Sequence, residues 1–291
     1  ERNLIKISYD LIFSMKTTLI IMAAGKSNRF RSLKQTEIIG PSDVTLMEYS
    51  IFDAVNAGFT NVIIIIRKEI ASYFQIIKAR IGDSINIQFV YQDLEQFTKN
   101  KKLNYFREKP WGTAHALLCC KNICKTAFVV INADDFYGKL SFEDAIQFFK
   151  IEDRSYFIIP FLFQNTLSEN GMVNRGICKV ENNLLTNIEE KRSLTKYNVE
   201  FENSVVSMNF WGFQPCIFTY IEHLFEPFLA NHNPSDEFFL SEVVDHIIKN
   251  NIEKFKVIQA KEQWHGITYK EDKIHTHNAL CKLQYPKDLW N

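Results

Sequence analysis

The chain has 291 residues, enough for one large α/β domain or two smaller ones, and 46% of them are hydrophobic. Lysine plus arginine and aspartate plus glutamate balance at 34 each, which excludes bulk electrostatic attraction to nucleic acid or to an anionic membrane. A small phosphorylated ligand needs only local positive charge, so the neutral total is compatible with one.

The spacing of the cysteines and the length of the apolar runs indicate the cellular compartment in which the protein is expected. The six cysteines show no paired Cys-x-x-Cys spacing, which argues against a disulfide framework or a structural zinc site and favours a reducing cytoplasm. No apolar stretch is long enough to span a bilayer, so no membrane association is expected. Residues 1–14 precede Met15 and lack signal-peptide features. We expect an N-terminal extension that need not be native, followed by a single domain over 15–291.

Strand and helix patterns alternate along the first half. In chain order, we expect a strand at 18–22, a helix at 46–57 closed by Gly58, strands at 61–66 and 85–91, a helix at 112–121, a strand at 127–132 and a helix capped by Ser141. This alternation predicts an α/β fold with a doubly wound, mostly parallel mixed sheet. Such sheets bind ligands at the carboxyl ends of their strands.

The second half is richer in strands. They are expected at 156–163, 176–181, 184–188, 205–213 and 255–258, with helices at 217–228, 236–249 and 270–283. No segment rich in proline, glycine and serine separates the halves, so the second half is interpreted as a strand-rich, substrate-side lobe of the same domain.

A loop of small and cationic residues follows the first strand. Ala23, Ala24 and Gly25 would let the backbone approach a ligand closely, and their amides could cradle a phosphate or meet the edge of a base. Arg29 and Lys34 add the charge that a polyphosphate needs. From composition alone, an ordinary strand-to-helix turn with solvated cations explains the loop equally well.

Two further segments have functional and plain interpretations. The Gly112-Thr113-Ala114 turn at a helix start could offer amides to base carbonyls, although an ordinary proline-initiated helix has the same pattern. Asp134 and Asp135 directly follow a buried strand, where paired carboxylates suit a divalent ion that carries phosphate oxygens. A solvated Asp-Asp turn is the alternative.

Taken in order, the segments at 23–35, 109–116, 132–138, 189–191 and 206–210 resemble nucleoside-diphosphate-sugar pyrophosphorylases, the sugar-1-phosphate nucleotidyltransferases. The resemblance implies a Rossmann-like fold of the GT-A type. It also implies that the first loop wraps the triphosphate, with Arg29 and Lys34 stabilising charge on the reacting phosphate. The implied nucleotide-binding residues are Ala23, Ala24, Gly25, Gly112, Thr113 and Ala114.

The same resemblance assigns the acceptor side and the metal. Gly176, Glu190 and Asn209 are expected at the sugar, and Lys191 at its phosphate as a third catalytic cation. Asp134 is expected to bind Mg²⁺. Many members place a second metal-binding aspartate where this chain has Gly266. Asp135, Asn209 and Asp272 are the alternatives for a second ligand, unless one aspartate suffices.

The implied reaction joins a nucleoside triphosphate to a sugar 1-phosphate with release of pyrophosphate. The attacking phosphate is already anionic near neutral pH, so alignment and charge neutralisation suffice. Rivals are a cytidylyltransferase for phosphocholine or another phosphorylated alcohol, a GT-A glycosyltransferase and a non-catalytic nucleotide-sugar binder. A glycosyltransferase would not need Arg29 and Lys34. The expected partners are a nucleoside triphosphate and a phosphorylated sugar or alcohol, and the oligomeric state is left open.

Overall fold

The computed structural model describes residues 16–25, 36–98, 107, 109–152 and 154–290. Four short strands of the first half form one end of the central sheet, and the apolar runs of three of them are almost fully buried because both faces of the sheet are covered. These strands are β1 (Thr18–Met22), β4 (Asn61–Ile66), β5 (Asn86–Tyr91) and β6 (Phe128–Asn132). They run parallel in the order β5-β4-β1-β6. The predicted bounds of β1 and β4 are confirmed.

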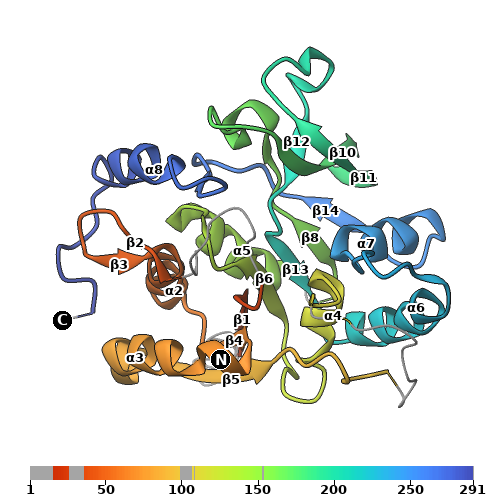
Figure 1. Cartoon of the computed structure of the whole chain (residues 1–291), viewed down its shortest axis with the longest axis horizontal. Coiled ribbons are helices and arrows are strands. Elements are labelled where there is room, and N and C mark those ends of the chain that lie inside the picture. Colours follow the sequence, from red (N-terminus) through yellow and green to blue (C-terminus); the bar gives the residue numbers. More distant parts are fainter. Residues whose placement is uncertain (1–15, 26–35, 99–106, 108, 153, 291) are drawn as a thin grey trace, which may run out of the picture.

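The second half continues the same sheet to eleven strands, in the order β13-β8-β14-β11-β10-β12-β9 after β6. The strands are β13 (Trp211–Phe213), β8 (Tyr156–Ile158), β14 (Phe255–Val257), β11 (Leu184–Leu194), β10 (Val173–Glu181), β12 (Val205–Ser207) and β9 (Phe161–Leu162). In the described part of this half, β14 and β8 pair in parallel and the other pairs are antiparallel. The mixed α/β sheet with a strand-rich lobe is therefore confirmed (Figure 1).

Helices cover both faces of the sheet. One face packs on α2 (Leu46–Ala57), α3 (Ala71–Ile81) and α5 (Lys139–Ile151), and the other on α4 (Thr113–Leu118), α6 (Ile217–Asn231) and α7 (Leu240–Lys249). A third apolar cluster joins α8 (Asp272–Leu280) to the hairpin of β2 (Ile38–Ile39) and β3 (Val44–Thr45) and to the pair of β7 (Asp135–Phe136) and β15 (His265–Gly266). The 3₁₀ turns are η2 (Lys68–Ile70), η3 (Gly82–Ser84), η4 (Phe163–Thr166) and η5 (Val199–Phe201). No helix in the described ranges is long and apolar enough to cross a membrane.

Local chemistry explains where the expected elements hold and where they fail. Helix α2 has the predicted bounds, and Gly58 closes it at φ 104° as expected. Ser141 is not a cap: α5 begins at Lys139 after Gly138, and the Ser141 hydroxyl donates to the carbonyl of Tyr137 inside the first turn. Helix α7 begins at Leu240 rather than at 236.

Two expected strands are each divided in two. The 156–163 segment breaks at Pro160, whose missing N–H interrupts a ladder, and gives β8 and β9. The 205–213 segment breaks at Asn209, which adopts φ 62°, a left-handed conformation that asparagine tolerates. Helix α3 was not among the expected elements. Residues 1–14 lie outside the described ranges, and the single-domain interpretation of 15–291 stays a prediction.

Candidate active site

The carboxyl ends of the parallel strands form one edge, and the expected nucleotide loop begins there. The Ala23 amide donates to the carbonyl of Ile65 at 2.8 Å, and the Ala133 amide donates to the carbonyl of Met22 at 3.2 Å. The backbone after β1 is thus held between the ends of β4 and β6. The start of the first loop, at Ala23, therefore lies near the segment that carries Asp134.

The catalytic cations expected in this loop, Arg29 and Lys34, lie outside the described residues. A different cation is described at the loop: the Arg67 Nε donates to the carbonyl of Ala24 at 3.0 Å. Arg67 directly follows β4, and its side chain is only 15% exposed. Sequence reasoning did not single it out, although its position after a buried strand at the ligand-binding edge was a usable signal.

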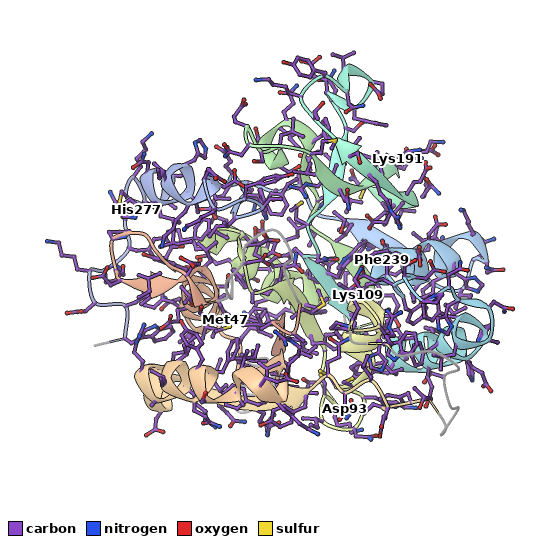
Figure 2. The ribbon with its side chains drawn as sticks, in the orientation of Figure 1. Met47, Asp93, Lys109, Lys191, Phe239 and His277 are labelled. Carbon is purple, nitrogen blue, oxygen red and sulfur yellow. The ribbon has the colours of Figure 1, made fainter. Side chains whose placement is uncertain are left out.

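The Gly112 turn is built against the segment that precedes α7. Gly112 adopts φ 114°, and a Cβ there would come within 2.6 Å of the carbonyl oxygen of Phe238. The Ala114 amide donates to that same carbonyl at 3.0 Å, and the Leu240 amide donates to the Thr113 hydroxyl at 2.9 Å. The Ala114 amide is therefore engaged within the protein. Lys109, which precedes this turn, forms an ion pair with Glu237 of the segment before α7, and Figure 2 labels Lys109 together with Phe239 of that segment.

The side chains of Gln92, which follows β5, and of the buried His115 lie against this turn. The Gln92 Nε2 lies 3.1 Å from the carbonyl oxygen of Gly112 and 3.3 Å from Nδ1 of His115. The His115 Nε2 lies 3.0 Å from the carbonyl oxygen of Gln96, and burial lowers the pKa of His115 to about 4. Gln92 also borders a cavity of about 270 Å³ at the ends of β4 and β5. Sequence reasoning missed both residues.

The expected metal-binding carboxylates lie at the end of β6. Asp135 is buried, and its Oδ2 accepts from Asn132 Nδ2 at 2.8 Å and lies 3.2 Å from the Tyr137 hydroxyl. Burial, and then the negative charge of Asp134, raise the pKa of Asp135 to about 7. Asp134 is more exposed than Asp135. It is therefore the carboxylate of the pair better placed to meet a solvated ion.

Asn209 joins the carboxylates to the acceptor side. Its side-chain Nδ2 donates to Asn132 Oδ1 at 3.1 Å, and its backbone N–H donates to the Ser207 hydroxyl at 3.2 Å. Ser207 pairs with Gly176 on the neighbouring strand. The structure therefore brings Asn209, Gly176 and the carboxylate pair into one connected group.

The sugar-side residues divide between two faces of the hairpin formed by β10 and β11. Gly176 pairs with Glu190, whose Oε1 accepts from the Ser241 hydroxyl of α7 at 2.6 Å. Lys191 is adjacent to Glu190, so its side chain starts from the opposite face, where Nζ lies 2.5 Å from Glu189 Oε1. Figure 2 labels Lys191 in the strand-rich part of the molecule. In the structure Gly176 and Glu190 therefore lie together, whereas Lys191 is paired with Glu189 and would have to leave that pair to reach an acceptor phosphate.

Asp135 and Asp272, two candidates for a second metal ligand, differ in their surroundings. Asp135 pairs with Gly266 across the short β7 and β15 pair. Asp272 lies at the start of α8, where Oδ2 accepts from the amides of Thr268 and Tyr269 at 2.9 and 2.7 Å. Its Oδ1 accepts from the side chains of Ser168 and Asn170 at 2.6 and 2.8 Å. Both carboxylate oxygens of Asp272 are therefore engaged in hydrogen bonds that stabilise the turn before α8.

The carboxylate set suits magnesium better than a metal that needs a full protein cage. Within the described ranges, no group of three or more histidine, cysteine, aspartate or glutamate residues is arranged to hold a metal ion. Magnesium commonly retains waters and uses one or two carboxylates together with substrate phosphates. The oxygen donors at Asp134 and Asp135 fit that mode of binding.

The chain belongs to the nucleotidyl transferase family, whose model matches residues 18–281. A bifunctional protein GlmU from Methanococcus vannielii is 23% identical over 202 residues, covering 67% of this chain and 42% of the relative. The chain thus spans less than half the length of that relative. The family resemblance drawn from the motifs is confirmed.

Solved structures show the same fold. A Bacillus anthracis structure provisionally assigned as a glucose-1-phosphate thymidylyltransferase has a TM-score of 0.69 at 14% identity, covering 94% of this chain and 98% of that one. The inositol-1-phosphate CTP transferase from T. maritima has a TM-score of 0.65 at 12% identity, covering 93% and 98%. At these identities the likeness establishes the fold alone.

Proposed function

We propose that the protein joins a nucleoside triphosphate to a sugar 1-phosphate, releasing pyrophosphate and forming a nucleoside-diphosphate sugar. The observation that carries the proposal is the connected row from Asp135 through Asn132 and Asn209 to Gly176 and Glu190, at the sheet edge where β1 ends. A family model that covers residues 18–281 supports the class of reaction.

The chemistry requires alignment of two phosphates. An oxygen of the acceptor phosphate attacks the α-phosphorus of the triphosphate, and the bond to the β-phosphate oxygen breaks as pyrophosphate leaves. Asp134, next to the buried Asp135, would hold Mg²⁺, which neutralises phosphate charge when bound. The proposed role of Arg29 and Lys34 is to bind the triphosphate. Arg67 would hold the backbone of the same loop in place through its hydrogen bond to the Ala24 carbonyl.

The acceptor would lie beside Gly176 and Glu190, where the lack of a side chain on Gly176 lets Ile188 and Glu190 pack closely against the strand. A Cβ at Gly176 would come within 3.2 Å of Glu190 Oε1, so glycine keeps this carboxylate close to the strand. Glu190 would accept hydrogen bonds from sugar hydroxyls.

We also propose a cytoplasmic location, which is supported by six free cysteines.

A second candidate is cytidylyl transfer to a phosphorylated alcohol, since the inositol-1-phosphate CTP transferase shares the fold. The experiment that tests both is pyrophosphate release by purified protein with Mg²⁺, five nucleoside triphosphates, several sugar 1-phosphates and phosphocholine. We expect turnover with at least one sugar 1-phosphate and none after addition of EDTA. Turnover with phosphocholine alone would favour the second candidate, and no turnover with any pair would contradict both.

A further inference from the structure

The side chain of Asn132 lies between a carboxylate of the candidate metal site and a residue expected at the acceptor. Its Nδ2 donates to Asp135 Oδ2 at 2.8 Å, and its Oδ1 accepts from Asn209 Nδ2 at 3.1 Å. Asn132 is the last residue of β6 and directly precedes the turn that carries Asp134. This half-buried amide therefore contacts both sides of the candidate active site, although no sequence motif assigned it a role.

The hydrogen bonds of Asn132 run in one direction, which is set at the Trp211 end. The indole Nε1 of Trp211 can only donate, and it lies 3.4 Å from Asn209 Oδ1, so the Asn209 amide turns its nitrogen toward Asn132. Asn132 must then present its oxygen to Asn209, which leaves its own nitrogen for Asp135. Reversing the Asn132 amide would place two donors face to face. Each of the two amides therefore has one preferred orientation.

Asn209 lies where the chain passes between two parts of the sheet. Before it, β12 pairs with β10 of the hairpin expected to hold the acceptor, and after it, β13 pairs with β6. Asn209 has the left-handed φ of 62° that separates these two strands. The bond from Asn209 to Asn132 therefore ties the acceptor side of the sheet to the strand end that carries the carboxylates.

A second bridge joins the same two segments without the Asn132 side chain. The backbone N–H of Asn132 donates to the Tyr137 hydroxyl at 3.0 Å, and that hydroxyl donates to the Met208 carbonyl at 2.7 Å. Tyr137 is fully buried, and Met208 directly precedes Asn209. Because this bridge remains when the Asn132 side chain is changed, we expect the fold to tolerate loss of the amide.

We propose that Asn132 is a positioning residue, whose amide holds Asn209 in register with the metal carboxylates and so aligns the acceptor with the metal-bound nucleotide. Transfer between two phosphates depends on this alignment, since a displacement of about 1 Å can cost about a hundredfold in rate. The inference rests on the proposed function in taking Asn209 as an acceptor residue and Asp134 as a metal ligand. Asn132 acts through these residues and needs no contact with either substrate.

Asn132→Leu removes both side-chain hydrogen bonds with little change in volume. With the substrate pair that turns over, kcat should fall about a hundredfold and the acceptor KM should rise about tenfold, while the nucleotide KM changes less than about threefold. Asn61→Leu is the matched control, because Asn61 Oδ1 accepts from Asn86 Nδ2 at 3.1 Å at the amino ends of β4 and β5. It should leave all three parameters unchanged. Lower thermal stability of Asn132→Leu with unchanged kinetics would indicate a purely structural role and overturn the proposal.

Nuclear magnetic resonance tests the positioning itself and does not depend on turnover. The measurement compares the assigned side-chain amide signals of Asn209 in the wild type and the variants. In Asn132→Leu these signals should move toward those of a solvent-exposed asparagine, and in Asn61→Leu they should stay. Unchanged Asn209 signals in Asn132→Leu would overturn the inference. The expected signal changes without pyrophosphate release from any substrate pair would contradict the proposed function and leave the positioning of Asn209 by Asn132 standing.

Asn209→Gly is the second variant, and it keeps the inference testable even if Asn132→Leu fails to fold. Glycine adopts a φ of 62° without cost, so the backbone between β12 and β13 is preserved. The side-chain amide signals of Asn132 should move, because Asn132 Oδ1 loses its donor. Unchanged Asn132 signals would overturn the inference. Where both variants fold, combining them should lower kcat no more than about twofold below Asn132→Leu alone, because the two residues act as one unit.

Discussion

Gly266 lies opposite Asp135, and a Cβ on Gly266 would come within 2.7 Å of Asp135 Oδ1 and within 2.2 Å of the Trp264 ring. The space in which many family members are expected to place an aspartate is thus taken by the Trp264 ring and the Asp135 carboxylate. Asp135 supplies a carboxylate from the facing strand, whereas Gly266 has no room for one.

We therefore expect Gly266→Asp to damage the site instead of restoring a metal ligand. Crowding of a packed position costs about 1–3 kcal/mol in the free energy of unfolding, and a second buried carboxylate beside Asp135 adds repulsion. Gly266→Ala is the matched variant, with the same Cβ and no charge. Urea unfolding should rank the stabilities as wild type, then alanine, then aspartate. Higher Mg²⁺-dependent turnover in Gly266→Asp would contradict this interpretation.

Asp134→Asn should lower Mg²⁺-dependent turnover by at least about a hundredfold, because an amide cannot neutralise the ion. Asp134 is more exposed than its buried neighbour, so the melting temperature should change little. Asp135→Asn is the companion variant. It should affect stability more, since Asp135 Oδ2 bonds to Asn132 at 2.8 Å inside the fold. Unchanged turnover in Asp134→Asn would show that the metal binds elsewhere.

Gly112→Ala should strongly destabilise the turn beside α7. The residue adopts φ 114°, and the added methyl would lie 2.6 Å from the Phe238 oxygen, so we expect a loss of about 3 kcal/mol or more. Gly58→Ala isolates the backbone contribution, because Gly58 has φ 104° with no atom within 4 Å of a Cβ. It should cost only about 1 kcal/mol. If Gly112→Ala and Gly58→Ala lost the same free energy of unfolding, the contact with the Phe238 oxygen could not explain the effect.

Lys191→Ala should raise the KM for the phosphorylated acceptor about tenfold and leave the KM for the nucleotide nearly unchanged. In the structure Lys191 pairs with Glu189, and exposed pairs of this kind are worth at most about 1 kcal/mol, so the side chain can leave it for a phosphate. Lys179→Ala is the control, because Lys179 of the same hairpin pairs with Glu181 at 2.9 Å. A larger change in the nucleotide KM would contradict the assigned role.

Asp53 should make the protein less stable as the pH rises. Burial raises the pKa of Asp53 to about 7, so between about pH 4 and 7 the native carboxyl stays protonated while the unfolded one ionises. The native state then binds more protons, and this group lowers the free energy of unfolding by roughly 1 kcal/mol per pH unit over that range.

Asp53→Asn should remove this dependence, because the amide oxygen can still accept from the Tyr285 hydroxyl, which lies 2.7 Å from Asp53 Oδ2. The stability difference between the variant and wild type, measured by denaturant unfolding, should grow from pH 5 to pH 7. Asp144→Asn on the surface of α5, where Lys261 pairs at 2.6 Å, serves as the control. A difference that stays constant with pH would refute the assigned burial effect.

Periodicity and strand-end chemistry could be interpreted from the sequence alone. The runs that became β1 and β4, the α2 helix with Gly58, and the family motifs depend on neighbours within a few residues, and local patterns encode such features directly. Breaks at Pro160 and Asn209 were missed because each is a single-residue departure inside a longer apolar run.

The sequence by itself thus determined the α/β class, the nucleotidyltransferase motifs and the edge at which they meet. Tertiary structure decided which side chains share that edge. Gly266 pairs with Asp135, more than a hundred positions away, and the Gln92 side chain lies against Gly112 and His115 of a later turn. Such contacts arise only when strand register and burial bring distant residues together, and no local pattern specifies them.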